Sequence, residues 1–340
     1  MKPRFGLGRR QGASDSREPP FTPDDAAGQV ADGEIDVDPA DSPTVETSQF
    51  PNAVPIRPDM GPPAPGPRAA NQQGSGLGLV ISIAISAIVF VLAIYATGGP
   101  TANPLPLAQT TNTLFWVVAA AATLAAGIGA LFADRTASRA EDFGHDGVIH
   151  VNTAWIVPVV STAAAVILVA TFHNTTMIVA GPLAAFLGNA GSLLSRDLLD
   201  DADDSAQQTA ITIQALVIHS VAFLALSALY LNKLSTPVTA LLAGAVTTVL
   251  AIEALDRSPA PQARKLTLAI LAGGAVTAAA VPLMWWPTHG WTGGAVLFVV
   301  FYCAVGIMQT ALERGSFRLR DAVEYGLVPL AAFLVLAFTA

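Results

Sequence analysis

Charged residues are scarce in this sequence. Asp, Glu, Lys and Arg make up 12% of the 340 residues, about half the share found in soluble domains. Hydrophobic residues make up 52%, and the mean hydropathy is +0.53. This balance is typical of an integral membrane protein. The formal net charge is -8, and no large basic surface is expected, so the composition argues against nucleic-acid binding.

Cysteine is almost absent as well. The single residue, Cys303, excludes a disulfide within one chain and a zinc site of the paired-cysteine type. The sequence also lacks a Walker A loop, an HExxH pair and a dinucleotide-binding glycine motif. We therefore predict no cofactor, and the sequence favours a protein that is not an enzyme.

Residues 1–76 differ in composition from the rest of the chain. They hold 13 of the 24 prolines and 11 of the 25 acidic residues, and they contain no Trp or Tyr. Such a segment cannot bury enough apolar surface to offset the entropy lost on ordering. We predict a disordered tail, and its length suggests a tether for a protein partner.

Nine apolar stretches follow the tail. Each has about 18–23 residues, enough to cross the hydrocarbon core of a bilayer as a helix. Only helices satisfy all backbone groups of such segments without water. The sequence therefore predicts an all-α, polytopic membrane bundle with spans at 77–96, 114–133, 154–172, 176–195, 209–231, 236–255, 266–286, 292–312 and 322–339.

The positive charges give this arrangement an orientation. If the tail is cytoplasmic, sixteen of the 17 Lys and Arg residues lie in the tail or in cytoplasmic loops, and only Lys233 lies outside. Positive residues are concentrated in the cytoplasmic loops of membrane proteins. We predict a protein of the bacterial inner membrane with its N-terminus in the cytoplasm and its C-terminus outside.

An acidic stretch follows the fourth span. If one helix continues through it, four carboxylates lie on one face at spacings of three and four residues: Asp197, Asp200, Asp201 and Asp204. A solvated linker or a site for a basic partner is the simpler interpretation. The alternative is a metal site, since carboxylates of this kind hold Mg²⁺.

The DDxxD spacing within this stretch resembles the aspartate motifs of membrane prenyltransferases. The resemblance implies Mg²⁺ ions that bridge a pyrophosphate. That family carries two such motifs, the first after its second helix. Here the corresponding loop has a different spacing of acidic residues, with Asp134, Glu141, Asp142 and Asp146.

A second group of polar residues lies within the spans. Five of them fall a few residues from the predicted cytoplasmic ends, at a similar depth: Asn189, Gln214, Glu253, Gln309 and Glu324. Polar groups in spans face other helices or water. The group predicts an inward-facing polar vestibule, and the alternative is local pairing, such as Glu253 with Arg257 at i, i+4. His219 lies near the midplane of the fifth span, where it relays protons or bonds to a neighbouring helix.

Small residues recur four apart in several spans, as at Ala180/Ala184/Gly188 and at Gly274/Ala278. Such spacings let two helices approach closely. We therefore expect some of these positions at helix–helix contacts.

The last hundred residues resemble an uncharacterised family of bacterial multi-pass membrane proteins. The residues that carry the resemblance are Glu253, the stretch GGAVLFVVFY from Gly293 to Tyr302, and RLRDAVEYGLV from Arg318 to Val328. The resemblance implies a multi-pass body, and it implies no activity.

Three functional hypotheses follow from the sequence. The leading one is a membrane scaffold or accessory subunit whose tail binds a partner. The alternative is a small-solute transporter that uses the polar vestibule and His219. The third is a Mg²⁺-dependent lipid or prenyl transferase that uses the acidic stretch.

Overall fold

A computed structural model describes residues 67–96, 113–138, 152–200, 204–232, 234–256, 258, 260–286, 291–314, 323, 325–327 and 330–331. All regular secondary structure in these residues is helical, which confirms the predicted all-α class. The main helices are α1 (Pro67–Ala96), α3 (Thr113–Ser138), α4 (Ile156–Phe172), α5 (Thr175–Asp200), α6 (Asp204–Asn232), α7 (Thr236–Leu255), α8 (Gln262–Trp285) and α9 (Thr292–Arg314).

Each of the first eight predicted spans overlaps one of these helices. The ninth predicted span, 322–339, is described only in part, as helix at residues 323, 325–327 and 330–331. Most of the predicted tail lies outside the described residues. Helix α1, however, begins at Pro67, so residues 67–76 are helical. Their Ala, Gln and Arg residues favour helix, and proline is well accommodated in a first turn.

Seven of the helices are long and apolar enough to span a membrane. Helix α4 is apolar but has only 17 residues, which is about 25 Å of helix. It is the interior helix: twelve of its side chains are buried, from Ile156 to Thr171. Protein rather than lipid therefore surrounds most of α4.

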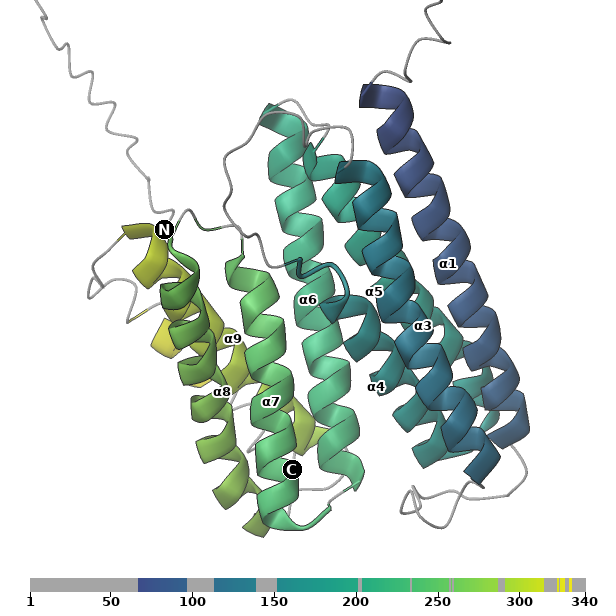
Figure 1. Cartoon of the computed structure of the whole chain (residues 1–340). Coiled ribbons are helices and arrows are strands. Elements are labelled where there is room, and N and C mark those ends of the chain that lie inside the picture. The colour runs from purple at the N-terminus through teal and green to yellow at the C-terminus, as the bar shows by residue number, and fades with distance from the viewer. Residues whose placement is uncertain are drawn as a thin grey trace, which may run out of the picture. The chain divides into compact units, whose positions relative to one another are not determined.

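The helices form two sets of four. In the first set, α1, α3, α4 and α5 contact one another in that cyclic order, and α6, α7, α8 and α9 do the same in the second set. One group of buried apolar side chains lies within the first set, and the other lies in the second set and includes Ile156 and Val157 of α4. Helices α4 and α6 lie between the outer helices of the two sets (Figure 1). The sets meet where α6 packs against α4 and α5.

Glycine permits a close helix contact between α7 and α8. A Cβ atom on Gly273 would lie 2.6 Å from the carbonyl oxygen of Gly244 and 1.9 Å from Oγ1 of Thr248. Gly274, which the spacing pattern selected, has no neighbour within 4 Å of such a Cβ atom. The adjacent residue Gly273 makes the contact, because the contact face is one helical position away from the predicted one.

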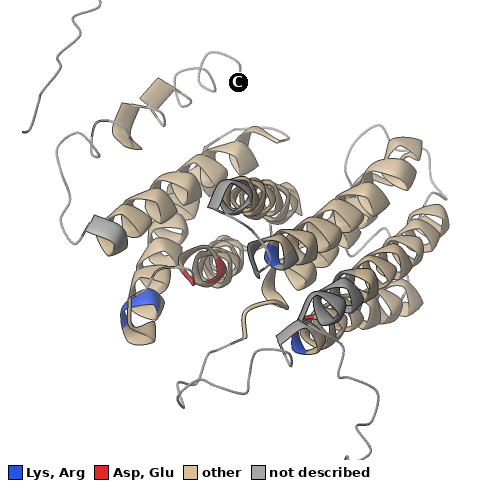
Figure 2. Cartoon of the chain, turned by 90° about the horizontal axis from the view of Figure 1, so that it is seen from above, with Lys and Arg blue, Asp and Glu red and all other residues tan. Residues whose placement is uncertain are grey.

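Charged side chains lie at one end of the bundle. Those described are near the last turns of α3, α5 and α7 and the first turns of α8, and they are Asp134, Arg135, Arg196, Glu253, Asp256, Arg264 and Lys265. Figure 2 shows how few places on the helices are charged. This end, called the charged end below, contains the candidate site.

Candidate functional site

A buried ion pair joins the two helix sets at the charged end. Nη2 of Arg196, near the end of α5, lies 2.6 Å from Oε1 of Glu253 in the last turn of α7. Glu253 is only 1% exposed, and the Arg196 side chain is 21% exposed. A carboxylate so deep in the protein needs a compensating cation, and Arg196 provides it from the other set.

The guanidinium of Arg196 also contacts the first set. Its Nη2 donates to Oγ1 of Thr153 at 2.7 Å, and its Nη1 lies 3.6 Å from Oδ1 of Asp134 on α3. The Thr153 hydroxyl in turn donates to Oδ2 of Asp256 at 3.0 Å. Arg196 therefore bridges α3, the start of α4 and α7, and it fixes the position of the two sets at this end.

Lys265 adds a second cation to this network from α8. Its Nζ lies 3.8 Å from Oδ1 of Asp256 and also donates to the backbone carbonyl oxygen of that residue. Both contacts hold the end of α7 against the start of α8. The Arg196–Glu253 pair, by comparison, connects helices that are distant in the chain.

Gln214 of α6 completes the surroundings of Glu253. Its Nε2 donates to Oε1 of Glu253 at 3.2 Å, so one carboxylate oxygen receives both the amide and the guanidinium. The other oxygen, Oε2, and Oε1 of Gln214 are buried with no hydrogen-bond partner among the described residues. Nε of Arg196 is in the same condition. Buried polar atoms are nearly always paired, so unpaired acceptors here mark a place that a donor would fill.

A small cavity lies between α6, α7 and α9, and both Gln214 and Glu253 line it. Its volume is about 50 Å³, enough for one or a few groups the size of a water molecule. The lining side chains are Ile211, Gln214, Ala215, Ile218, His219, Glu253, Ala254, Val305 and Gln309. We call this space the inner cavity.

A larger and mainly apolar groove adjoins it between α6 and α9. Its volume is about 570 Å³, and its lining residues are Thr212, Ala215, Leu216, His219, Phe298, Val299 and Tyr302. We call it the outer groove. Because Ala215 and His219 line both spaces, the inner cavity and the outer groove meet at this turn of α6.

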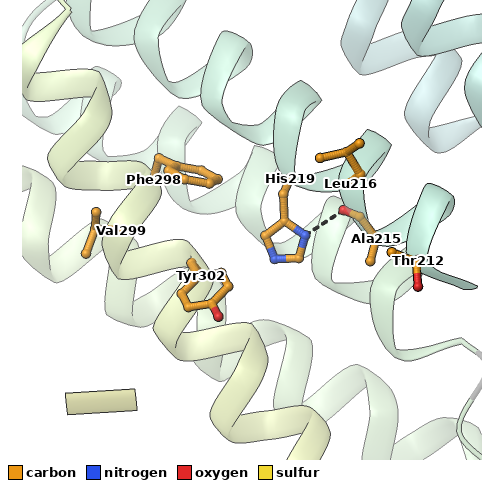
Figure 3. Close-up of a pocket in the computed structure, with 7 residues that line it drawn as sticks. All are labelled: Thr212, Ala215, Leu216, His219, Phe298, Val299 and Tyr302. Carbon is orange, nitrogen blue, oxygen red and sulfur yellow. Dashed lines mark hydrogen bonds between the residues drawn. The ribbon is translucent and has the colours of Figure 1, made fainter. Parts of the chain in front are cut away.

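His219 stands where the two spaces meet. Its ring points from α6 toward Tyr302 of α9, and Nδ1 lies 2.6 Å from the carbonyl oxygen of Ala215 (Figure 3). A carbonyl oxygen only accepts, so Nδ1 carries a hydrogen and Nε2 is the acceptor of the neutral ring. The rings of Phe298, Phe301 and Tyr302 surround the imidazole at centroid distances of 6.3, 5.7 and 5.5 Å.

The structure thus brings together four of the residues that the sequence selected. Gln214, Glu253, Gln309 and His219 all line the inner cavity. Asn189 lies elsewhere: its Nδ2 donates to Oγ1 of Thr162 at 3.1 Å and to the carbonyl oxygen of Ala185. Glu324 lies outside the described residues.

The acidic stretch is divided between two helices. Asp197 and Asp200 belong to the end of α5, and Asp204 begins α6. Asp201 lies outside the described residues, and no side-chain position is described for the other three. Within the described part of the chain, no group of three or more His, Cys, Asp or Glu side chains is placed to hold a metal ion.

Sequence reasoning missed Arg196 as a site residue. It treated Arg196 only as a loop charge and paired Glu253 with Arg257, the nearest basic residue along the chain, which lies outside the described residues. One signal was present: Arg196 follows the predicted span 176–195 directly, at the depth of Glu253 near the end of 236–255. Which helices are neighbours decided the pairing, and the sequence does not give that.

A family model covers residues 101–339, which includes every helix of the site. The chain belongs to the family described as "Protein of unknown function (DUF5656)". The match confirms the predicted resemblance to an uncharacterised family and extends it well beyond the last hundred residues. Helix α1 precedes the part that matches DUF5656. No curated protein and no solved structure matches this DUF5656 chain.

Proposed function

We propose that this chain is a membrane transporter that binds a small cationic solute at Glu253. The observation that carries the proposal is the fully buried carboxylate with an unpaired oxygen beside the inner cavity. Ionisable residues within membrane spans are costly and serve function more often than stability. A cation bound there would satisfy Oε2 of Glu253 and Oε1 of Gln214, which are both acceptors.

The arrangement of the helices supports transport. Two four-helix sets with the same cyclic order of neighbours resemble the repeats from which many transporters are built. Substrate sites of such proteins lie at the interface between repeats. The Arg196–Glu253 pair lies where the first and second sets meet. Breaking and remaking this contact would let the two sets move against one another.

The proposed location is the bacterial inner membrane, with the charged end in the cytoplasm. The distribution of Lys and Arg supports this orientation. The test is a single cysteine at Leu198, near the end of α5, in a Cys303→Ala background. An impermeant maleimide should label it in inside-out vesicles and leave it unlabelled in intact spheroplasts. Labelling only in spheroplasts would reverse the orientation.

Flux in proteoliposomes tests the transport function. The purified full-length chain should take up radiolabelled methylammonium faster than protein-free liposomes do. Glu253→Gln should reduce the protein-dependent uptake at least about tenfold, because it removes the charge that attracts the cation. Asn189→Ala is the matched control, since Asn189 is a buried polar residue bonded to Thr162, away from the inner cavity. Equal uptake by the Glu253→Gln and unmodified proteins would overturn the proposal.

A scaffold function is the other proposal that follows from the sequence. It depends on residues 1–66, which lie outside the described residues. Its support is therefore the length and composition of that segment. A tail that binds a partner is compatible with transport by the helical body.

A further inference from the structure

We propose that the solute bound at Glu253 is a membrane-dissolved primary amine with an apolar body, which reaches the inner cavity from the bilayer through the outer groove. This inference depends on the proposed binding site at Glu253 and names its substrate class and its route. It rests on the shape of the two spaces, the unpaired atoms in one of them and the side chains between them.

The unpaired atoms require a donor. Gln214 is 4% exposed and Glu253 is 1% exposed, both line the inner cavity, and each has an oxygen with no hydrogen-bond partner among the described residues. Oxygen acceptors need a group that carries hydrogens on nitrogen or oxygen. A protonated primary amine has three such hydrogens and a charge opposite to that of Glu253. A quaternary ammonium has the charge without the hydrogens, and an alcohol has a hydrogen without the charge.

The sizes of the two spaces suit a ligand with a small charged head and a larger apolar body. The inner cavity, at about 50 Å³, accommodates an ammonium head and little more. The outer groove, at about 570 Å³, is within the range of pockets that enclose a small organic molecule. Its lining is mainly aliphatic and aromatic, which suits the apolar part of the same ligand.

The side chains between the two spaces favour a cation. Rings of Phe298 and Tyr302 line the outer groove, and aromatic faces attract a passing ammonium. Because Nδ1 donates to Ala215, Nε2 of an uncharged His219 ring is an acceptor at the junction and would give the third amine hydrogen a partner. Among the described residues that line either space, none is Lys or Arg. A phospholipid head group would therefore bring its phosphate toward the Glu253 carboxylate, and the cation there, Arg196, is already bonded to Oε1 of Glu253.

Binding to the full-length protein in nanodiscs tests this inference without any flux measurement. The probes are hexylamine, hexanol and hexyltrimethylammonium, and empty nanodiscs give the background for partition into lipid. Hexylamine should bind at least about tenfold more tightly than either of the other probes, because it alone has both charge and N–H donors. Glu253→Gln should remove this preference. Equal affinity for the three probes would overturn the inference.

A separate variant tests the proposed route through the outer groove. Ala215 lines both spaces, so Ala215→Leu should fill the passage while leaving every polar group in place. We expect hexylamine affinity to fall at least about tenfold. Ser220→Leu is the control, because Ser220 is an exposed residue of α6 that lines neither space. Hexylamine affinity unchanged by Ala215→Leu would overturn access through the outer groove.

The two proposals fail separately. Hexylamine binding with no methylammonium uptake would overturn transport and retain the amine site. Methylammonium uptake that depends on Glu253, with no preference for hexylamine, would retain transport and overturn the amphipathic substrate. Thermal unfolding of each variant checks that a loss of binding does not come from a loss of folding.

Discussion

Replacing Arg196 by Met should destabilise the protein more than replacing Glu253 by Gln, although each change breaks the same 2.6 Å ion pair. The two partners are unequal because Glu253 is 1% exposed and the Arg196 side chain is 21% exposed. Without Arg196, the carboxylate keeps only the amide of Gln214, at 3.2 Å. Leaving one member of a buried pair uncompensated costs about 3–5 kcal/mol.

The opposite change leaves fewer groups without a partner. Glu253→Gln retains an acceptor oxygen, and Arg196 keeps Thr153 at 2.7 Å and Asp134 at 3.6 Å. We expect a loss of about 1.5–3 kcal/mol, the value of a hydrogen bond to a charged group. The double variant should be more stable than Arg196→Met alone, because Gln at position 253 removes the buried charge that Arg196→Met leaves behind.

Thermal unfolding of the purified protein in a mild detergent measures this order. Midpoints should decrease from the unmodified protein to Glu253→Gln, then the double variant, then Arg196→Met. Arg264→Met is the control: Arg264 is exposed at the same end, where a substitution changes stability by about 0.5 kcal/mol or less. If Arg196→Met were as stable as Glu253→Gln, or if the double variant were the least stable of the three, the reasoning would be refuted.

Three further predictions concern other parts of the chain. Gly273→Ala should lower the thermal midpoint, since overpacking against Gly244 costs about 1–3 kcal/mol. Gly274→Ala should raise the midpoint slightly, because alanine has the higher helix propensity. A lower midpoint for Gly274→Ala would contradict the described α7–α8 contact. Deleting residues 1–66 should leave hexylamine binding unchanged and should remove any partner that co-purifies stoichiometrically, and a complex that survives deletion would exclude the tail tether. Added Mg²⁺ should not change methylammonium uptake, either in the unmodified protein or in the Asp200→Asn/Asp201→Asn variant. If the unmodified protein showed Mg²⁺-dependent prenyl transfer and this variant lost it, the result would instead favour the lipid-enzyme hypothesis.

The sequence determined the class of the protein and the depth of its polar residues. About 20 apolar residues in a row require a helix wherever water is absent, so hydropathy alone located the helical segments. Depth follows from position along the span. This is why the sequence groups Gln214, Glu253 and Gln309 at one level, and in the structure they line one cavity.

The direction in which each residue points was decided only by the tertiary structure. Asn189 shares the predicted depth of the vestibule, but it faces Thr162 on α4. Gly273 contacts α7, whereas a Cβ atom on its neighbour Gly274 would meet no atom of the described residues within 4 Å. A helix that is apolar all round has no amphipathic stripe from which its inner face can be read. The sequence therefore left the rotation of each helix about its axis open.

The partner of Glu253 was decided in the same way. The sequence paired Glu253 with Arg257, which lies outside the described residues, and the structure shows Arg196 of α5 bonded to Glu253 across the interface between the two sets. Segments far apart in the chain become neighbours only when the two sets pack, and neither residue spacing nor hydropathy predicts which helices will pack together. Composition and the length of the apolar stretches determined that this protein is a bundle of apolar helices, and helix packing determined that Glu253 lines a cavity.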